Sequence, residues 1–185
     1  MTEARHSPAA PVLNGSLGLQ SLCRRIQEFP ACDILELGPV RSDNLDFWSR
    51  FHPALYIADL RSSLPLPGSS PEASEFVEPG WERLVALPAG RKFDAILAWD
   101  LLNYLDLEGV SSLTAYLKRF CRPGTILFSL IFDQKEMPGD ITIYRIKDEA
   151  HLHYENPGLG LRACPRHQPR ALGLAMTGFR TCDSF

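Results

Sequence analysis

Three residues of the sequence stand where a bound ligand could be contacted: Gly38, Asp59 and Asp100. Each comes at the end of a short apolar segment that is typical of a β-strand. Glycine lets the backbone approach a ligand closely, and a following helix presents free N–H groups. Asp59 comes 21 residues after Gly38, a separation at which a carboxylate can accept hydrogen bonds from both ribose hydroxyls of an adenosine. Together these residues predict a nucleotide-type binding site.

Strands that alternate with helices must bring these residues together. Apolar runs predict the strands, and apolar side chains at spacings of three and four predict the helices. Because the strands are apolar on both faces, we expect a mostly parallel sheet covered by helices on both faces, with its ligand beyond the carboxyl ends of the strands. The predicted strands cover residues 33–38, 55–58, 93–99 and 125–132. The predicted helices cover residues 19–29, behind a cap at Ser16, and residues 44–51, 101–105 and 110–120.

The remaining segments predict less regular additions to this sheet. Residues 84–86 predict a weak third strand, and residues 141–147 with 150–155 predict a β-hairpin that follows the fifth strand and covers one end of the sheet. Residues 169–176 predict a helix and residues 178–185 a final strand. Pro, Ala and small polar residues without an apolar period predict a mobile N-terminal arm over residues 1–14. Residues 15–185 then form a single domain.

Composition favours a cytoplasmic protein. The 185 residues, 45% of them hydrophobic, suit one domain with a sizeable core. A net charge of -3 gives no support to nucleic-acid binding or to attraction by an anionic membrane. Five cysteines without a C-x-x-C pair indicate reduced thiols. The sequence contains no apolar run of about 18 residues and no signal-peptide pattern, so we expect neither secretion nor a membrane span.

Four segments in this order resemble the successive motifs of the class I S-adenosylmethionine-dependent methyltransferases. They are DILELG at 33–38, YIADL at 56–60, FDAILAWDLLNYL at 93–105 and FCRPGTILFS at 120–129. The resemblance covers about residues 32–132 and rests on the ordered set, because no single motif is specific. It implies a Rossmann-like, doubly wound sheet, an S-adenosylmethionine cofactor, and an acceptor substrate that is a small molecule or a protein.

The resemblance also assigns roles to individual residues. It implies that Glu36 and Gly38 lie beside the methionine portion of the cofactor, that Asp59 holds the ribose, and that Trp99 and Asp100 flank the cofactor after the fourth strand. The positions assigned to cofactor binding are Glu36, Gly38, Pro39, Asp59, Leu60, Trp99 and Asp100. It names no catalytic residue. Because methyl transfer depends largely on positioning the acceptor, a dedicated base is optional. The hairpin offers the candidates Tyr144, His151, His153 and Tyr154.

Three departures from the family pattern favour an alternative, a non-catalytic protein that keeps the fold as a binding or assembly module. Val40 stands where the family usually has a second glycine, and Ala86 stands near the usual adenine-contacting acid. After the fifth strand the sequence has room for a sixth strand but not for the seventh. The C-terminal edge of the sheet is therefore incomplete unless the hairpin or the partner subunit of a homodimer closes it.

Each assigned residue also has a simpler structural explanation. Gly38 could form a tight turn, Asp59 could cap a strand end, Asp100 could cap the following helix, and Trp99 could pack in the core. A nicotinamide-dependent oxidoreductase is disfavoured, because Gly-x-Gly-x-x-Gly does not follow the first strand. His and Cys residues that together resemble a zinc ligand set have spacings that are common by chance, so no metal site is predicted. They are His151, His153, Cys164 and His167.

Overall fold

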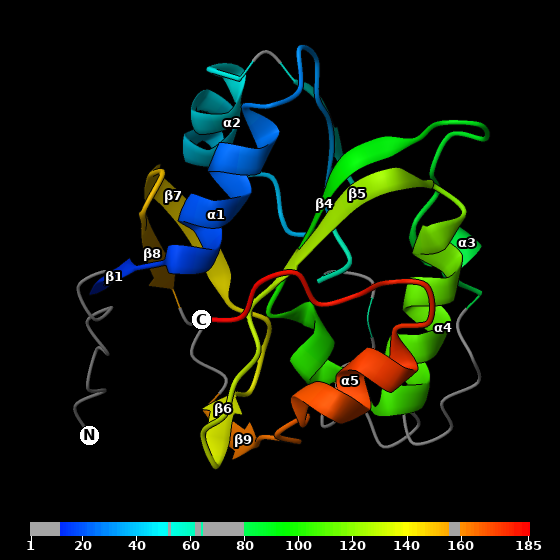
Figure 1. Cartoon of the computed structure of the whole chain (residues 1–185). Helices are drawn as coiled ribbons and strands as arrows, with labels where there is room; N and C mark the ends of the chain where they lie inside the picture. The colour runs from blue at the N-terminus through cyan, green and yellow to red at the C-terminus, as the bar shows by residue number, and fades with distance from the viewer. Residues whose placement is uncertain (1–11, 52, 62–63, 65–79, 156–159) are drawn as a thin grey trace, which may run out of the picture.

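The structure, a computed structural model, describes residues 12–51, 53–61, 64, 80–155 and 160–185 (Figure 1). Within these ranges the chain forms three sheets of four, three and two strands, together with helices. The strands are β1 (Val12–Gly15), β2 (Asp33–Glu36), β3 (Ala54–Ile57), β4 (Phe93–Trp99), β5 (Cys121–Ser129), β6 (Glu136–Pro138), β7 (Ile143–Asp148), β8 (His151–Glu155) and β9 (Leu161–Ala163). The helices are α1 (Leu17–Ile26), α2 (Ser42–Ser49), α3 (Trp81–Leu84), the 3₁₀ helix η2 (Leu101–Tyr104), α4 (Leu107–Lys118) and α5 (Pro169–Ala175).

The central sheet consists of four parallel strands in the order β3-β2-β4-β5. From β2 the chain moves to β3 on one side, and it later returns to β4 on the other side of β2. The direction of the connections therefore changes between β2 and β4, and in open parallel sheets this is where ligands bind. The prediction of a parallel sheet in a mixed α/β chain is confirmed.

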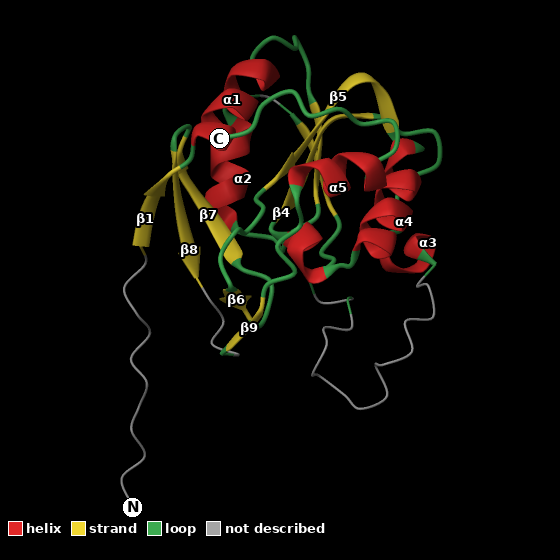
Figure 2. Cartoon of the chain, turned by 60° about the horizontal axis from the view of Figure 1, so that its bottom comes forward, coloured by secondary structure: helices red, strands yellow, loops and turns green. Residues whose placement is uncertain are grey.

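Helices lie on both sides of the central sheet, and each side has its own apolar cluster (Figures 1 and 2). Ile34, Ala95 and Leu97 pack in the cluster that includes α1 and α2. Leu35 and Ile96 pack in the cluster that includes α4 and α5. This division follows from strand geometry, because successive side chains of a strand point to opposite faces.

Helix α1 forms as the sequence predicts. Leu19, Leu22, Cys23 and Ile26 are all buried, which is the result of their spacing of three and four residues on one face of a helix. The side chain of Ser16 accepts a hydrogen bond from the backbone N–H of Leu19 at 3.1 Å. The predicted cap at Ser16 is therefore confirmed.

The predicted hairpin is present as β7 and β8, which are antiparallel, and β1 pairs with the other edge of β8. In β1, Asn14 lies opposite Leu152. Residues 12–14 therefore belong to a sheet, which corrects the prediction of a mobile arm for these residues. The physical reason is that the outer edge of β8 offers backbone groups that β1 satisfies. Residues 1–11 of the predicted arm lie outside the described residues.

Asn44 fixes the hairpin to helix α2. Its buried side chain donates a hydrogen bond to the carbonyl of Tyr144 (3.1 Å) and accepts one from the backbone N–H of Ile146 (2.8 Å). At the same place the ring of Tyr144 stacks on Trp99 at the carboxyl end of β4. The hairpin thus covers this end of the central sheet, as predicted.

The third predicted strand, over residues 84–86, is wrong. Leu84 ends the helical turn α3, and Val85 and Ala86 follow it outside any strand. The turn packs where it does because Trp81 is buried and its indole N–H donates a hydrogen bond to Ser112 of α4 at 2.9 Å. The backbone N–H of Val85 donates to the carbonyl of Trp81 at 2.7 Å and closes the turn. The segment therefore packs on α4 instead of extending the sheet beyond β3.

The final predicted strand, over residues 178–185, is also wrong. This segment runs from α5 across to α1 without strand pairing (Figures 1 and 2). Side chains hold it: Asp183 accepts hydrogen bonds from Ser21 (2.8 Å) and Arg25 (3.0 Å) of α1. Because the tail passes from one helical layer to the other, it does not run alongside β5, and the expected sixth strand does not form.

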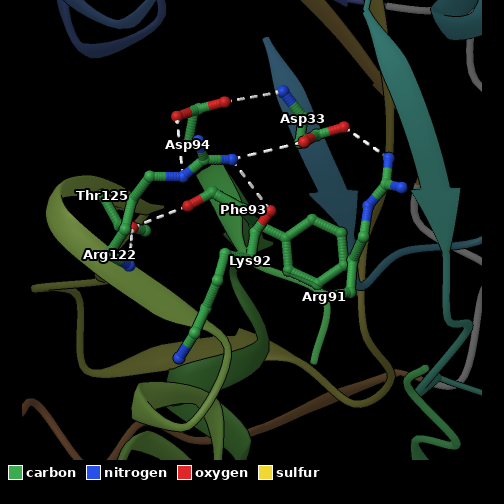
Figure 3. A network of polar contacts seen from close by, with 7 residues as sticks. All are labelled: Asp33, Arg91, Lys92, Phe93, Asp94, Arg122 and Thr125. Carbon is green, nitrogen blue, oxygen red and sulfur yellow. Dashed lines mark hydrogen bonds and ion pairs between the residues drawn. The ribbon is translucent and has the colours of Figure 1, made fainter. Parts of the chain in front are cut away.

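A polar network joins the amino ends of β2, β4 and β5 (Figure 3). The Arg122 guanidinium contacts Asp33 and the buried Asp94, each at 3.2 Å. Arg91 pairs with the other oxygen of Asp33 at 2.5 Å, and the backbone N–H of Asp33 donates to Asp94 at 2.8 Å. The network lies at the end of the sheet opposite the carboxyl edge, where it ties the ends of the three strands together.

Candidate functional site

The candidate site lies at the carboxyl ends of β2 and β4, where the strand order changes direction. Strand β2 ends at Glu36 and β4 ends at Trp99. The neighbouring end of β3 is tied to this point, because the backbone N–H of Ala58 donates to the carbonyl of Glu36 at 2.8 Å. Of the residues predicted from the sequence, the structure brings Glu36, Gly38 and Trp99 into direct contact.

Glu36 is buried at the end of β2 and is only partly satisfied. One carboxylate oxygen, Oε1, accepts hydrogen bonds from the backbone N–H of Gly38 (3.1 Å) and from the indole N–H of Trp99. The other, Oε2, has no hydrogen-bond partner among the described residues. Burial raises the pKa of Glu36 to about 8, although the two hydrogen bonds act in the opposite direction. Glu36 therefore exchanges a proton near neutral pH.

Trp99 has an unusual backbone for a large side chain. Its φ angle is 47°, in the left-handed region that bulky residues rarely adopt. The β4–β5 pairing shifts register between Leu97 and Trp99, and such a bulge redirects a side chain. The indole stacks on Tyr144, with ring centroids 5.2 Å apart and planes 10° apart, and meets the edge of Phe128 at 5.6 Å. In this arrangement the Trp99 side chain packs in the core, which agrees with its simpler structural explanation.

Gly38 is needed for close approach and not for a left-handed turn. It is not among the glycines with positive φ. A Cβ atom at this position would lie 2.9 Å from Glu36 Oε1 and 3.1 Å from Trp99 Cδ1. The Trp99 indole therefore lies close to Gly38, where the sequence predicts a ligand.

The two residues after Gly38 lie toward the surface. Pro39 is partly exposed and Val40 is 59% exposed. The Val40 side chain is therefore not packed in the core at the position where the family usually has a second glycine.

Asp100 is fully buried directly after Trp99. Its Oδ2 accepts hydrogen bonds from the backbone N–H of Thr142 (3.0 Å) and from the Tyr104 hydroxyl (3.5 Å), while Oδ1 has no partner among the described residues. Burial raises the pKa of Asp100 to about 6, against the effect of its hydrogen bonds to Thr142. Its side chain makes no capping bond to η2, so the simple capping explanation does not hold.

The segment before β7 contributes residues that the sequence did not reveal. The carbonyl of Asp140 accepts a hydrogen bond from the Tyr104 hydroxyl at 2.5 Å. Arg61, which follows the end of β3, pairs with the Asp140 carboxylate at 2.5 Å and donates to the carbonyl of Ile141 at 3.2 Å. These contacts hold Thr142 beside Asp100, where its backbone N–H donates to the Asp100 carboxylate at 3.0 Å. Only a fold that returns the hairpin to the sheet edge makes this connection, and no sequence motif signals it.

Asp59 and Leu60 lie after β3 at the same edge. Asp59 Oδ1 accepts a hydrogen bond from the backbone N–H of Arg61 at 3.0 Å, so this carboxylate does stabilise a turn. Leu60 is fully buried in the cluster that includes α4, and its backbone N–H donates to the carbonyl of Leu37 at 3.1 Å. The Leu60 side chain therefore packs in the core, and a ligand could meet only its backbone.

The side chains that resemble a zinc ligand set have separate neighbours. His151 pairs with Asp148 at 2.8 Å, and His167 contacts the carbonyl of Leu105 at 2.8 Å. The Cys164 thiol lies 3.6 Å from the carbonyl of Phe132. In the part of the chain that the structure describes, no three His, Cys, Asp or Glu side chains are grouped to hold a metal ion.

Among the candidate bases, Tyr144 is poorly suited to accept a proton. Burial raises the pKa of Tyr144 well above its usual range, and the nearby Asp100 carboxylate acts in the same direction. Tyr154, by comparison, is 40% exposed. The ring of Tyr144 therefore contributes packing against Trp99 instead of proton transfer.

A surface hollow of about 280 Å³ lies elsewhere, between α3 and α4, and is lined by Trp81, Ser112 and Arg119 among others. None of the predicted site residues lines it. Within the described ranges, no helix combines the length and apolar character that crossing a membrane requires. Comparison with known proteins gave no match: no protein-family model matches the chain, and neither a curated protein nor a solved structure matches it.

Proposed function

We propose that the chain is a cytoplasmic, S-adenosylmethionine-binding methyltransferase-like protein with a doubly wound, Rossmann-like domain, acting on a small-molecule or protein acceptor. The observation that carries this proposal is the gathering of buried oxygens at one sheet edge. Glu36 Oε2 and Asp100 Oδ1, at the carboxyl ends of β2 and β4, are both buried without a hydrogen-bond partner among the described residues. Buried polar atoms normally have partners, so two such carboxyl groups at the switch between β2 and β4 support a polar ligand that pairs with them.

The acids at this edge favour a cationic ligand over an anionic one. Burial raises the pKa of Glu36 to about 8 and that of Asp100 to about 6, so a bound cation would stabilise their ionised forms, while the guanidinium of Arg61 is engaged with Asp140. A ligand with an ammonium group and a sulfonium would be attracted here, whereas the phosphates of a dinucleotide would be repelled. This agrees with the lack of a glycine-rich phosphate loop after β2.

The residues fit S-adenosylmethionine in part. Glu36 would accept hydrogen bonds from its ammonium group, Asp59 would hold the ribose hydroxyls, and Asp100 with Trp99 would flank it after β4. When bound, the cofactor supplies an activated methyl group on its sulfonium. The chain's own contribution would be to bury and orient the acceptor for an in-line displacement, which is largely a matter of positioning. Among the residues that the structure describes, none is singled out as a general base.

A second candidate is a non-catalytic binding or assembly module with the same fold. The position of Trp99 favours it, because the indole covers Gly38 and occupies the hydrogen-bonding oxygen Oε1 of Glu36. If this closed arrangement is permanent, the cofactor has no access to the sheet edge. The two candidates therefore differ in one property, which is whether the site can admit S-adenosylmethionine.

Calorimetric titration of the full chain with S-adenosylmethionine and with S-adenosylhomocysteine tests the proposal. We expect saturable binding of both, and we expect Asp59→Ala to remove most of the affinity while the protein stays folded. Asp46→Ala, which changes an exposed acid of α2, is the matched control and should bind as the unmodified protein does. Neither heat nor a thermal shift with either ligand at millimolar concentration would contradict the proposal and favour the non-catalytic module.

A further inference from the structure

Trp99 combines a disfavoured backbone conformation with a side chain held by several contacts. Its φ of 47° lies in the left-handed region, its indole N–H donates to Glu36, and its ring stacks on Tyr144 of β7. A strained residue persists only where its surroundings hold it, and such residues cluster at ligand sites and switches. We infer that Trp99 is a gate over the carboxyl edge, held shut by Tyr144, which opens only for a ligand whose ammonium group replaces the indole N–H on Glu36.

The closed position blocks the site directly. The indole carbon Cδ1 lies 3.1 Å from the place where a Cβ of residue 38 would be, so no ligand atom can reach the Gly38 backbone from this side while the ring is there. Phe128 makes a T-shaped contact with the ring, with centroids 5.6 Å apart. Access to the Gly38 backbone and to Glu36 Oε1 therefore requires the indole to move.

The backbone at Trp99 is anchored, so the movement is a rotation of the side chain. The carbonyl of Trp99 accepts hydrogen bonds from the backbone N–H of Leu130 and from the Ser129 hydroxyl, both at 2.7 Å. What the ring loses on opening is the stack on Tyr144, the edge contact with Phe128 and the hydrogen bond to Glu36. The backbone of Tyr144 is itself fixed by Asn44, so its ring offers the indole a held stacking partner.

Opening leaves the buried Glu36 carboxyl group with the Gly38 N–H as its remaining donor among the described residues, and this loss disfavours its ionised form further. A ligand therefore gains most if it brings a charged donor to the same oxygen. An ammonium group meets this need, whereas a neutral nucleoside does not. This choice of ligand rests on the proposed function, while the gate itself rests on the Trp99 contacts alone.

The gate is tested by ¹⁹F NMR of the full chain labelled with 5-fluorotryptophan, with the Trp99 resonance assigned from Trp99→Phe. Trp48 and Trp81 are the internal controls. We expect S-adenosylhomocysteine to move the Trp99 resonance and to increase its solvent isotope shift, and 5′-methylthioadenosine, which lacks the ammonium group, to leave it in place. A methylthioadenosine effect as large as that of S-adenosylhomocysteine would overturn the proposed selectivity.

Tyr144→Leu separates the gate from the ligand, and Tyr144→Phe, which keeps the ring, is its matched control. Without any ligand, Tyr144→Leu should increase the solvent isotope shift of Trp99, and Tyr144→Phe should not. Tyr144→Leu should also bind S-adenosylhomocysteine about three- to tenfold more tightly, since an aromatic pair no longer holds the closed state. An unchanged Trp99 resonance in folded Tyr144→Leu would refute the gate.

The outcomes also separate failure of the gate from failure of the proposed function. If neither the unmodified protein nor Tyr144→Leu binds S-adenosylhomocysteine, the proposed function and the ligand choice fail together. The gate would still be judged by the ligand-free Trp99 resonance. If Tyr144→Leu does not fold, the response of Trp99 to S-adenosylhomocysteine in the unmodified protein decides, and a bound ligand with a stationary Trp99 would refute the gate.

Discussion

The indole N–H of Trp99 donates a hydrogen bond to the carboxylate of Glu36, which joins the carboxyl ends of the two adjacent strands β4 and β2. The bond places the last side chain of β4 over Gly38, and it leaves the second oxygen of Glu36 without a partner among the described residues. A buried acid that is only half satisfied affects both the stability of the fold and what the edge can bind.

Glu36→Gln should change how stability depends on pH. The pKa of Glu36 is about 8 in the folded protein, against about 4.3 for an unperturbed glutamate. Between these values the folded state holds a proton that the unfolded chain has released. The free energy of unfolding therefore falls as pH rises, by at most about 1.4 kcal/mol per pH unit for this group. Glutamine keeps an acceptor for Trp99 and removes this loss, so the variant should gain relative stability from pH 5 to 8.

Urea denaturation of both proteins at pH 5, 6, 7 and 8 measures this difference. Asp100→Asn is the comparison, because the pKa of Asp100 is about 6. In the unmodified protein the loss of stability that comes from Asp100 should occur between about pH 4 and pH 6, and Asp100→Asn should remove it. A difference between Glu36→Gln and the unmodified protein that stays constant from pH 6 to pH 8 would show that Glu36 does not titrate there.

Asn44→Leu should loosen the hairpin. The change leaves the carbonyl of Tyr144 and the N–H of Ile146 buried without their side-chain partner, which we expect to lower the free energy of unfolding by about 2–4 kcal/mol. Asp43→Asn, on the same helix, disrupts an exposed pair with Arg145 and should cost at most about 1 kcal/mol. Equal losses from the two changes in guanidinium denaturation would show that Asn44 does not hold the hairpin.

Arg122→Met should destabilise the sheet without affecting ligand binding. Its guanidinium contacts two acids, one of which, Asp94, is buried. Because Arg122 is itself partly exposed, we expect a loss of about 1–3 kcal/mol, somewhat less than for a fully buried pair. Arg91→Met removes a pair with Asp33 and a cation–π contact with the Tyr56 ring, and it should cost about 1 kcal/mol. Thermal denaturation ranks the two, and a smaller effect for Arg122→Met would contradict the role given to Asp94.

Gly38→Ala should disturb the contact between Glu36 and Trp99. The added methyl group would lie within 3.1 Å of both side chains, and we expect a loss of about 1–3 kcal/mol from overpacking. Gly15→Ala places its methyl group where no atom lies within 4 Å and should change stability by less than about 0.5 kcal/mol. If denaturant unfolding shows equal stability for the two variants, the close packing at Gly38 is not present in solution.

Local patterns predicted the parallel sheet and its edge, because apolar runs and helical spacing are short-range properties. Gly38, Asp59 and Asp100 follow strands that are parallel, so the topology alone brings them to one edge. The third strand was predicted wrongly at residues 84–86, since the burial of Trp81 against α4 outweighs a weak strand propensity. Tertiary contacts override such short segments easily.

The closed state of the site could not be predicted from the sequence. Trp99 and Tyr144 are far apart in the chain and belong to different sheets, and only the bulge at the end of β4 turns the indole toward the hairpin. In the same way, Thr142 meets Asp100 because Arg61 and Tyr104 hold the preceding segment in place. These contacts depend on how two separately predicted units pack, which no spacing within either unit encodes.

The most direct test of the proposed function is a crystal structure of the full chain with S-adenosylhomocysteine. We predict density for the ligand along the edge between Gly38, Asp59 and Asp100, with its ammonium group on Glu36 and with the Trp99 indole turned away from Gly38. Ligand-free crystals grown at millimolar S-adenosylhomocysteine, with the indole still stacked on Tyr144, would contradict the account.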